Sequence, residues 1–72
     1  MSGKTYAVII ERGSTGYGAY VPDLPGVISV GDSEDEVTAN IQEAIALHLD
    51  GLRQAGAAIP EPRSSVTFID AA

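Results

Sequence analysis

The chain has no cysteine, only four basic residues among 72, and no long apolar run. The lack of cysteine excludes disulfides and thiolate zinc sites as sources of stability. The basic residues are scattered, whereas contacts to nucleic acid phosphates need clustered Lys and Arg. No stretch approaches the ~20 apolar residues of a membrane span, and the N-terminus lacks a signal-peptide core. We therefore expect a cytoplasmic protein that contacts neither nucleic acid nor membrane directly.

Acidic residues dominate what is present. Ten Asp and Glu residues against four basic ones give a formal net charge of −6 at pH 7. Such a charge suits a basic partner, and it also keeps a protein soluble. At this length the chain is near the lower limit for a self-sufficient core, so we expect one domain over residues 1–72. Oligomerisation is the usual remaining way to stabilise so small a chain.

One stretch, residues 33–55, has the apolar periodicity of an amphipathic helix. Its start is indicated by Ser33 and Glu36, a capping-box spacing in which each side chain can bind the other residue's backbone N–H. Its end is indicated by Gly56 and then Pro60. The apolar arc of this helix contains Val37, Ile41, Ala44, Ile45, His48, Gly51, Leu52 and Ala55. We expect these side chains to face a sheet.

Strand patterns precede and follow the helix. Residues 4–12, 17–21 and 27–30 predict three strands, and residues 65–69 (SVTFI) predict a fourth. The Pro- and Gly-containing segment 22–26 predicts a rigid turn. The order β-β-β-α-β indicates an α+β fold, with an antiparallel-type sheet and one long helix on one face.

A single helix covers only one face of such a sheet. The other face contains Ala7, Ile9 and Tyr20 in the predicted strands, and their burial requires a second chain. We therefore expect these three residues in the interface of a homodimer or homotetramer. Gly51 costs about 1 kcal/mol of helix propensity relative to Ala, which predicts close approach of the helix to the sheet or to another subunit.

Chemistry-bearing residues are few. The glycine-rich segment 13–18 superficially resembles a phosphate-binding loop, but it joins two strands and has no Lys, so an ordinary hairpin is the better interpretation. His48 is the only histidine, and a packed side chain explains it more simply than a general base or a metal ligand. We expect no catalytic residues and no cofactor.

Carboxylates gather at the predicted helix start, where Asp32, Glu34, Asp35 and Glu36 suggest a metal site at first sight. Capping and the helix dipole already account for them, and their spacing does not match a calcium loop, so we expect no metal. Asp23 lies in the predicted turn. A role in stabilising the turn is the first interpretation of Asp23, and contact with a partner is the second.

Residues 16–27 (GYGAYVPDLPGV) and 31–37 (GDSEDEV), with the helix over 40–52 and the return over 59–62, resemble the HicB-like antitoxin family. The resemblance covers nearly the whole chain. It implies a compact β-β-β-α-β domain, described as a partial RNase H-like fold, that usually self-associates. It also implies that the chain neutralises a HicA toxin, a small basic mRNA-cleaving ribonuclease, by covering its RNA-binding face and catalytic His.

By this analogy the contact surface for the toxin includes Asp23 and the helix-start residues Asp32, Glu34 and Asp35. Charge complementarity with a basic toxin would accelerate association and make it salt-sensitive. Many family members continue into a DNA-binding segment. This chain ends after the predicted fourth strand without a basic segment, so we do not expect it to regulate transcription by itself.

Two other functions stay open. One is an orphan homo-oligomeric domain that binds another protein or a small ligand at its subunit interface, without catalysis. The other, a metal-dependent nuclease, is disfavoured because the central positions of the first strand are Val8 and Ile10 rather than a metal-binding Asp.

Overall fold

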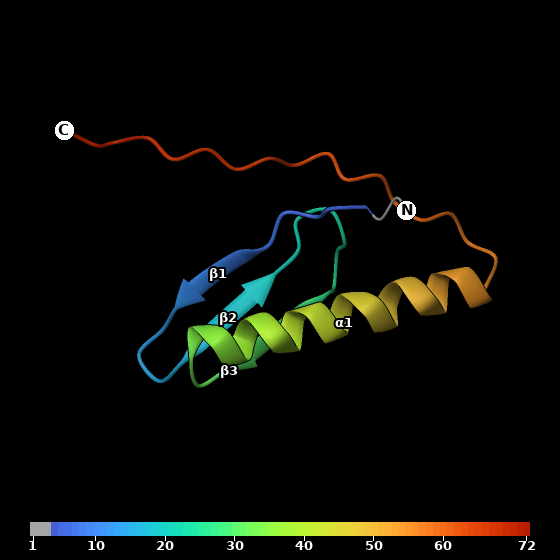
Figure 1. The fold of residues 1–72 in the computed structure, drawn as a ribbon, viewed down its shortest axis with the longest axis horizontal. Coiled ribbons are helices and arrows are strands. Elements are labelled where there is room, and N and C mark those ends of the chain that lie inside the picture. Colours follow the sequence, from blue (N-terminus) through green and yellow to red (C-terminus); the bar gives the residue numbers. More distant parts are fainter. Residues whose placement is uncertain (1–3) are drawn as a thin grey trace.

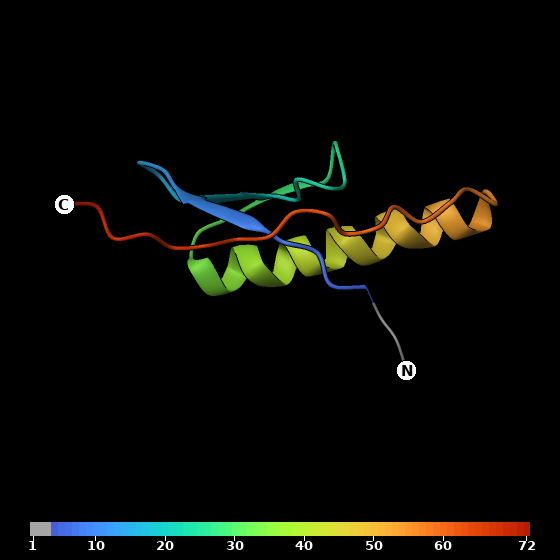
Figure 2. The ribbon, with the colours of Figure 1, turned by 90° about the horizontal axis from the view of Figure 1, so that it is seen from above.

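The computed structural model describes residues 4–72, in which three strands precede one long helix. The elements are β1 (Ile9–Arg12), β2 (Tyr17–Tyr20), β3 (Ile28–Gly31) and α1 (Glu34–Gln54). The strands form one antiparallel sheet in the order β1-β2-β3. Helix α1 lies across one face of this sheet (Figure 1), and the view from above shows the two layers (Figure 2). The predicted α+β fold, with three antiparallel strands followed by one long helix, is confirmed. Residues 1–3 of the predicted domain lie outside the described residues.

The pairing register assigns the strand side chains to two faces. Ile10 pairs with Ala19 on the face that packs against α1. Ile9 pairs with Tyr20, and Tyr20 with Ile28, so these three residues share the opposite face. The buried core comprises Ala19, Val21, Leu24, Val27, Val37 and Ile41.

The predicted apolar arc of α1 is only partly covered. Its N-terminal half packs as expected, with Val37 and Ile41 buried and Ala44 and Ile45 against them. Leu49 also packs against the core, although the predicted arc did not include it. The C-terminal half of the arc is not covered because the helix is longer than the sheet. Helix α1 has 21 residues and extends about 32 Å, whereas each four-residue strand extends about 13 Å.

The turn between β2 and β3 places the Leu24 side chain in the buried core. Val21 N–H donates to the Val27 carbonyl at 3.3 Å, and inside this bridge Leu24 N–H donates to the Val21 carbonyl at 3.1 Å. Gly26 has φ +88°, a conformation that favours glycine. Leu24 is 0% exposed, so this turn is part of the core and not a surface connection.

Both ends of α1 carry the predicted caps, with one correction. Ser33 Oγ accepts from Glu36 N–H at 3.0 Å. The Glu36 carboxylate accepts from the backbone N–H of Asp32, and not from that of Ser33 as the capping box predicted. At the C-terminus, Gly56 has φ +71° and donates to the Arg53 carbonyl. This left-handed residue satisfies the last turn, as expected.

Two glycines have opposite surroundings. A Cβ at Gly31 would lie 2.6 Å from Val37 N, so the end of β3 touches the first turn of α1. A Cβ at Gly51 would meet nothing within 4 Å. The predicted close approach of Gly51 to the sheet is therefore wrong, because this part of α1 extends beyond the short strands.

Strand boundaries also differ from the prediction. The first strand begins at Ile9 instead of residue 4, because its partner strand ends at Tyr20. Beyond Tyr20, Val21 N–H serves the turn and Pro22 has no N–H to donate. The second strand ends one residue earlier than predicted, at Tyr20, and the third covers Ile28–Gly31 instead of 27–30.

The predicted fourth strand over residues 65–69 is wrong for the single chain. No strand is assigned after α1 within the described residues, and residues 65–72 extend away from β1 (Figure 1). Strand propensity alone forms no strand, since each strand requires a hydrogen-bonded neighbour.

Candidate functional site

The acidic helix start consists of Asp32, Glu34 and Asp35, which flank the N-cap residue Ser33. All three are exposed, and within residues 4–72 no hydrogen bond or ion pair engages their carboxylates. The α1 dipole stabilises negative charge here, and the contact of Gly31 with Val37 fixes this end of the helix to β3. The result is a group of solvent-exposed carboxylates on a backbone whose position is fixed by the sheet.

Asp23, the fourth predicted contact residue, lies elsewhere and already has partners. Its Oδ2 accepts from the backbone N–H groups of Arg63 and Ser64, both at 2.8 Å, and its Oδ1 accepts from Ser64 Oγ at 2.9 Å. The bonds from the Ser64 and Arg63 backbones hold the pKa of the Asp23 carboxyl below its ordinary value of 3.8. Asp23 therefore tethers the returning chain instead of bonding its own turn.

The structure does not bring Asp23 together with the acidic helix start. Asp23 follows β2, whereas Asp32 follows β3, which runs antiparallel to β2. These residues therefore lie at opposite ends of the sheet, about 13 Å apart along the strands. Figure 1 shows the turn after β2 and the start of α1 at these two ends.

The outer face of the sheet, which α1 does not cover, contains the predicted interface residues. Tyr20 is exposed there, and Ile9 and Ala7 are half-buried. Ala7 and Ile9 alternate with Tyr6, Val8 and Ile10, which pack against the core. The same face includes two residues that the sequence analysis missed, the exposed Ile28 and Val30. Their alternation in β3 was the signal that could have identified them.

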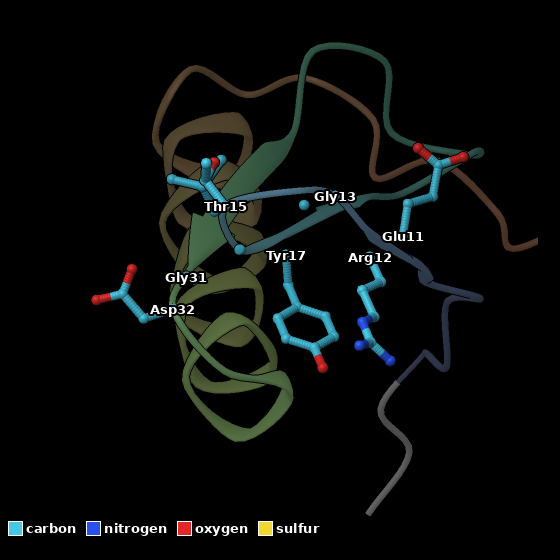
Figure 3. Close-up of a pocket in the computed structure, with 10 residues that line it drawn as sticks. Glu11, Arg12, Gly13, Thr15, Tyr17, Gly31 and Asp32 are labelled. Carbon is cyan, nitrogen blue, oxygen red and sulfur yellow. The ribbon is translucent and has the colours of Figure 1, made fainter.

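An open depression of about 500 Å³ lies at the hairpin end of the sheet. Figure 3 shows that Arg12 and Tyr17 point to one side, Glu11 to another, and Asp32 away from them. Gly13 N–H donates to the Gly16 carbonyl at 2.7 Å, which confirms the predicted hairpin. These charged groups diverge, so the depression does not assemble an acid, a base and a nucleophile around one point.

Other groups also give no reaction centre. Within residues 4–72, no three His, Asp or Glu side chains are grouped to hold a metal ion. His48 is half-buried on α1, and no hydrogen bond to its ring is found in the described part of the chain. No described helix is long and apolar enough to cross a membrane.

A family model described as "HicB_like antitoxin of bacterial toxin-antitoxin system" matches residues 6–71. The chain is 34% identical over 65 residues to a 14.9 kDa protein of the rep-hol intergenic region of Haemophilus phage HP1, covering 90% of this chain and 49% of that relative. It is 41% identical over 58 residues to a UPF0150 protein of Helicobacter pylori, covering 81% of each chain. The chain thus spans about half the length of the phage relative. No solved structure matches it.

Proposed function

Because the chain belongs to the HicB-like antitoxin family of bacterial toxin-antitoxin systems, we propose that it binds a small basic HicA-type toxin and masks its mRNA-cleaving site. The proposal includes a cytoplasmic location, where such a toxin meets mRNA. It also assigns the chain a binding role without catalysis, since its charged groups diverge at the open depression.

The acidic helix start is the observation that carries this proposal. Asp32, Glu34 and Asp35 are exposed, and the net charge of the chain is −6. A surface that binds mRNA must be basic, so the same surface attracts a cluster of exposed carboxylates. An antitoxin docked there excludes RNA by occupying its site and by neutralising the charge that attracts it.

Asp23 has a different role in this proposal. Both of its carboxylate oxygens accept hydrogen bonds from Arg63 or Ser64, so a toxin would have to displace these contacts to reach them. The acidic helix start requires no such exchange. We therefore expect the toxin to contact the end of the sheet where α1 begins.

Affinity purification tests the proposal. The tagged chain, incubated with host lysate at low and then at high salt, should recover a small basic protein whose RNA cleavage stops when the chain is added. Salt should weaken the recovery, because exposed charge pairs are screened. Recovery of only the chain itself, as a defined oligomer, would contradict the proposal.

Paired charge variants locate the contact. Glu34→Gln with Asp35→Asn should weaken toxin binding by roughly two- to twenty-fold, since each exposed ion pair contributes little. Glu43→Gln with Asp50→Asn is the matched control, because both residues are exposed on α1 away from its start and the net charge changes equally. Equal weakening by the two pairs would indicate only long-range attraction and would remove the helix start from the contact.

A second candidate function is a homo-oligomeric domain that binds another protein or a small ligand between subunits. The uncovered outer face, with exposed Tyr20, Ile28 and Val30, favours this candidate. It predicts that the purified chain forms an oligomer and that no basic protein is recovered with it.

A further inference from the structure

Gly18, in the central strand β2, is a glycine that the fold itself does not require. Its φ lies outside the left-handed region, which among the described glycines only Gly26 and Gly56 occupy. A Cβ at Gly18 would meet one atom within 4 Å, the Ser29 carbonyl oxygen at 3.9 Å, which is an ordinary contact. Glycine nevertheless weakens a strand, and inside a strand it often marks a place where another group approaches closely. The space above Gly18 is therefore available to a group from outside the chain.

The strand register surrounds this space with side chains on three sides. Gly18 pairs with Glu11 of β1 and with Val30 of β3, so these two residues lie on either side of it on the outer face. Tyr20, two positions further along β2, forms the third side. The fourth side opens toward the hairpin, where Gly16 lines the same open depression as Glu11, Gly18 and Val30. We call this space, with its glycine floor and its three bounding side chains, the Gly18 notch.

Glu11 gives the Gly18 notch a negative charge that has no partner in the described chain. Its side chain is exposed, and within residues 4–72 no hydrogen bond or ion pair engages its carboxylate. Arg12, the adjacent basic residue, points to the other side of the hairpin (Figure 3). The other strand residues on the outer face are uncharged, so a cation for Glu11 has to come from another molecule.

We propose that the Gly18 notch binds one arginine side chain of a protein partner. The planar guanidinium would lie over the flat backbone at Gly18, donate two hydrogen bonds to the Glu11 carboxylate and contact the Tyr20 ring. Its aliphatic stem would cover Val30, which is 74% exposed. Lysine has no planar fork to fill such a space, so arginine is the better fit.

The position of the Gly18 notch indicates which partner supplies this arginine. Asp32, a member of the acidic helix start, lines the same depression. A protein bound at the helix start therefore also reaches the notch, and we assign the arginine to the small basic toxin, so that the inference rests on the proposed function. A second copy of this chain fits less well, because the strands on its outer face would offer Glu11 only uncharged side chains and another Glu11.

Filling the notch separates binding from folding, because a side chain at position 18 has room in the fold. In urea unfolding, Gly18→Ala and Gly18→Val should leave the midpoint unchanged or raise it. Their affinity for the small basic protein recovered in the affinity purification should fall with side-chain size, by roughly tenfold for Val. Gly51→Ala is the control, because position 51 is also open but lies near the far end of α1, and its affinity should equal that of the wild type.

Removal of the charge tests the carboxylate separately. Glu11→Gln should weaken the binding roughly fivefold, and it should add little to Gly18→Val, because both changes remove the same contact. Glu43→Gln is the matched control, since it removes one exposed carboxylate from α1 away from its start.

The outcomes distinguish the notch from the proposed function. If the wild-type chain recovers no basic protein, both are contradicted. If it binds such a protein and Gly18→Val and Glu11→Gln bind equally well, the notch alone is overturned. A lower urea midpoint for Gly18→Ala would show that the fold requires this glycine, and a change in the mass of free Gly18→Val in light scattering would show that a second copy fills the space. Either result would also overturn the notch.

Discussion

Leu24→Ala should destabilise the domain strongly, although Leu24 lies in a turn. Its side chain is 0% exposed and packs within the buried core. Truncation of a buried Leu to Ala costs about 2–5 kcal/mol, because apolar contact is lost and a cavity remains. A domain of 72 residues has a total free energy of unfolding of roughly 4–11 kcal/mol. The substitution therefore removes a large share of the stability.

Thermal unfolding followed by circular dichroism measures this effect. The melting temperature should fall by roughly 8–40 °C, given about 4–8 °C per kcal/mol for a domain of this size. Leu47→Ala is the matched control: Leu47 is 68% exposed, so the same substitution should change the stability by less than about 0.5 kcal/mol. Both proteins are compared at one concentration, because any association contributes to the melting temperature. Similar melting temperatures for the two variants would refute the assignment of Leu24 to the core.

Three further outcomes are expected. Gly31→Ala should destabilise the domain by about 1–3 kcal/mol in urea unfolding, because its Cβ would lie 2.6 Å from Val37 N; an unchanged midpoint would contradict this contact. Gly51→Ala should stabilise the helix by up to about 1 kcal/mol in the same assay, because its Cβ would meet nothing within 4 Å; a lower midpoint would contradict this open position. The tether to Asp23 should be present above pH 3.8 and be lost as pH falls through the lowered pKa of its carboxyl, since the folded state favours the ionised form. NMR shifts of the Ser64 amide should report this transition, and Asp23→Asn should abolish it.

Local features of the fold could be predicted from the sequence because neighbouring residues determine them. The Ser33 cap, the left-handed Gly56 and the hairpin at Gly13 each depend on residues a few positions apart. The alternation of β1 likewise separated the outer residue Ile9 from the inner residue Ile10.

Features that depend on distant partners could not be predicted. The Asp23 side chain binds Arg63 and Ser64, which follow it by 40 and 41 residues, and no local pattern connects these positions. Residues 65–69 have strand propensity, but propensity does not indicate which strand, if any, would pair with them. The position of Gly51 depends on how far α1 extends past the sheet, which the helix pattern alone does not define.

Titration of RNA cleavage tests the proposed function most directly. The small basic toxin that the proposal requires is purified and incubated with a labelled RNA and increasing amounts of the chain. We expect cleavage to stop near stoichiometric addition at low salt, and the variant with Glu34→Gln and Asp35→Asn to require more protein. Cleavage that continues unchanged in excess chain would contradict the proposal that this domain masks the toxin.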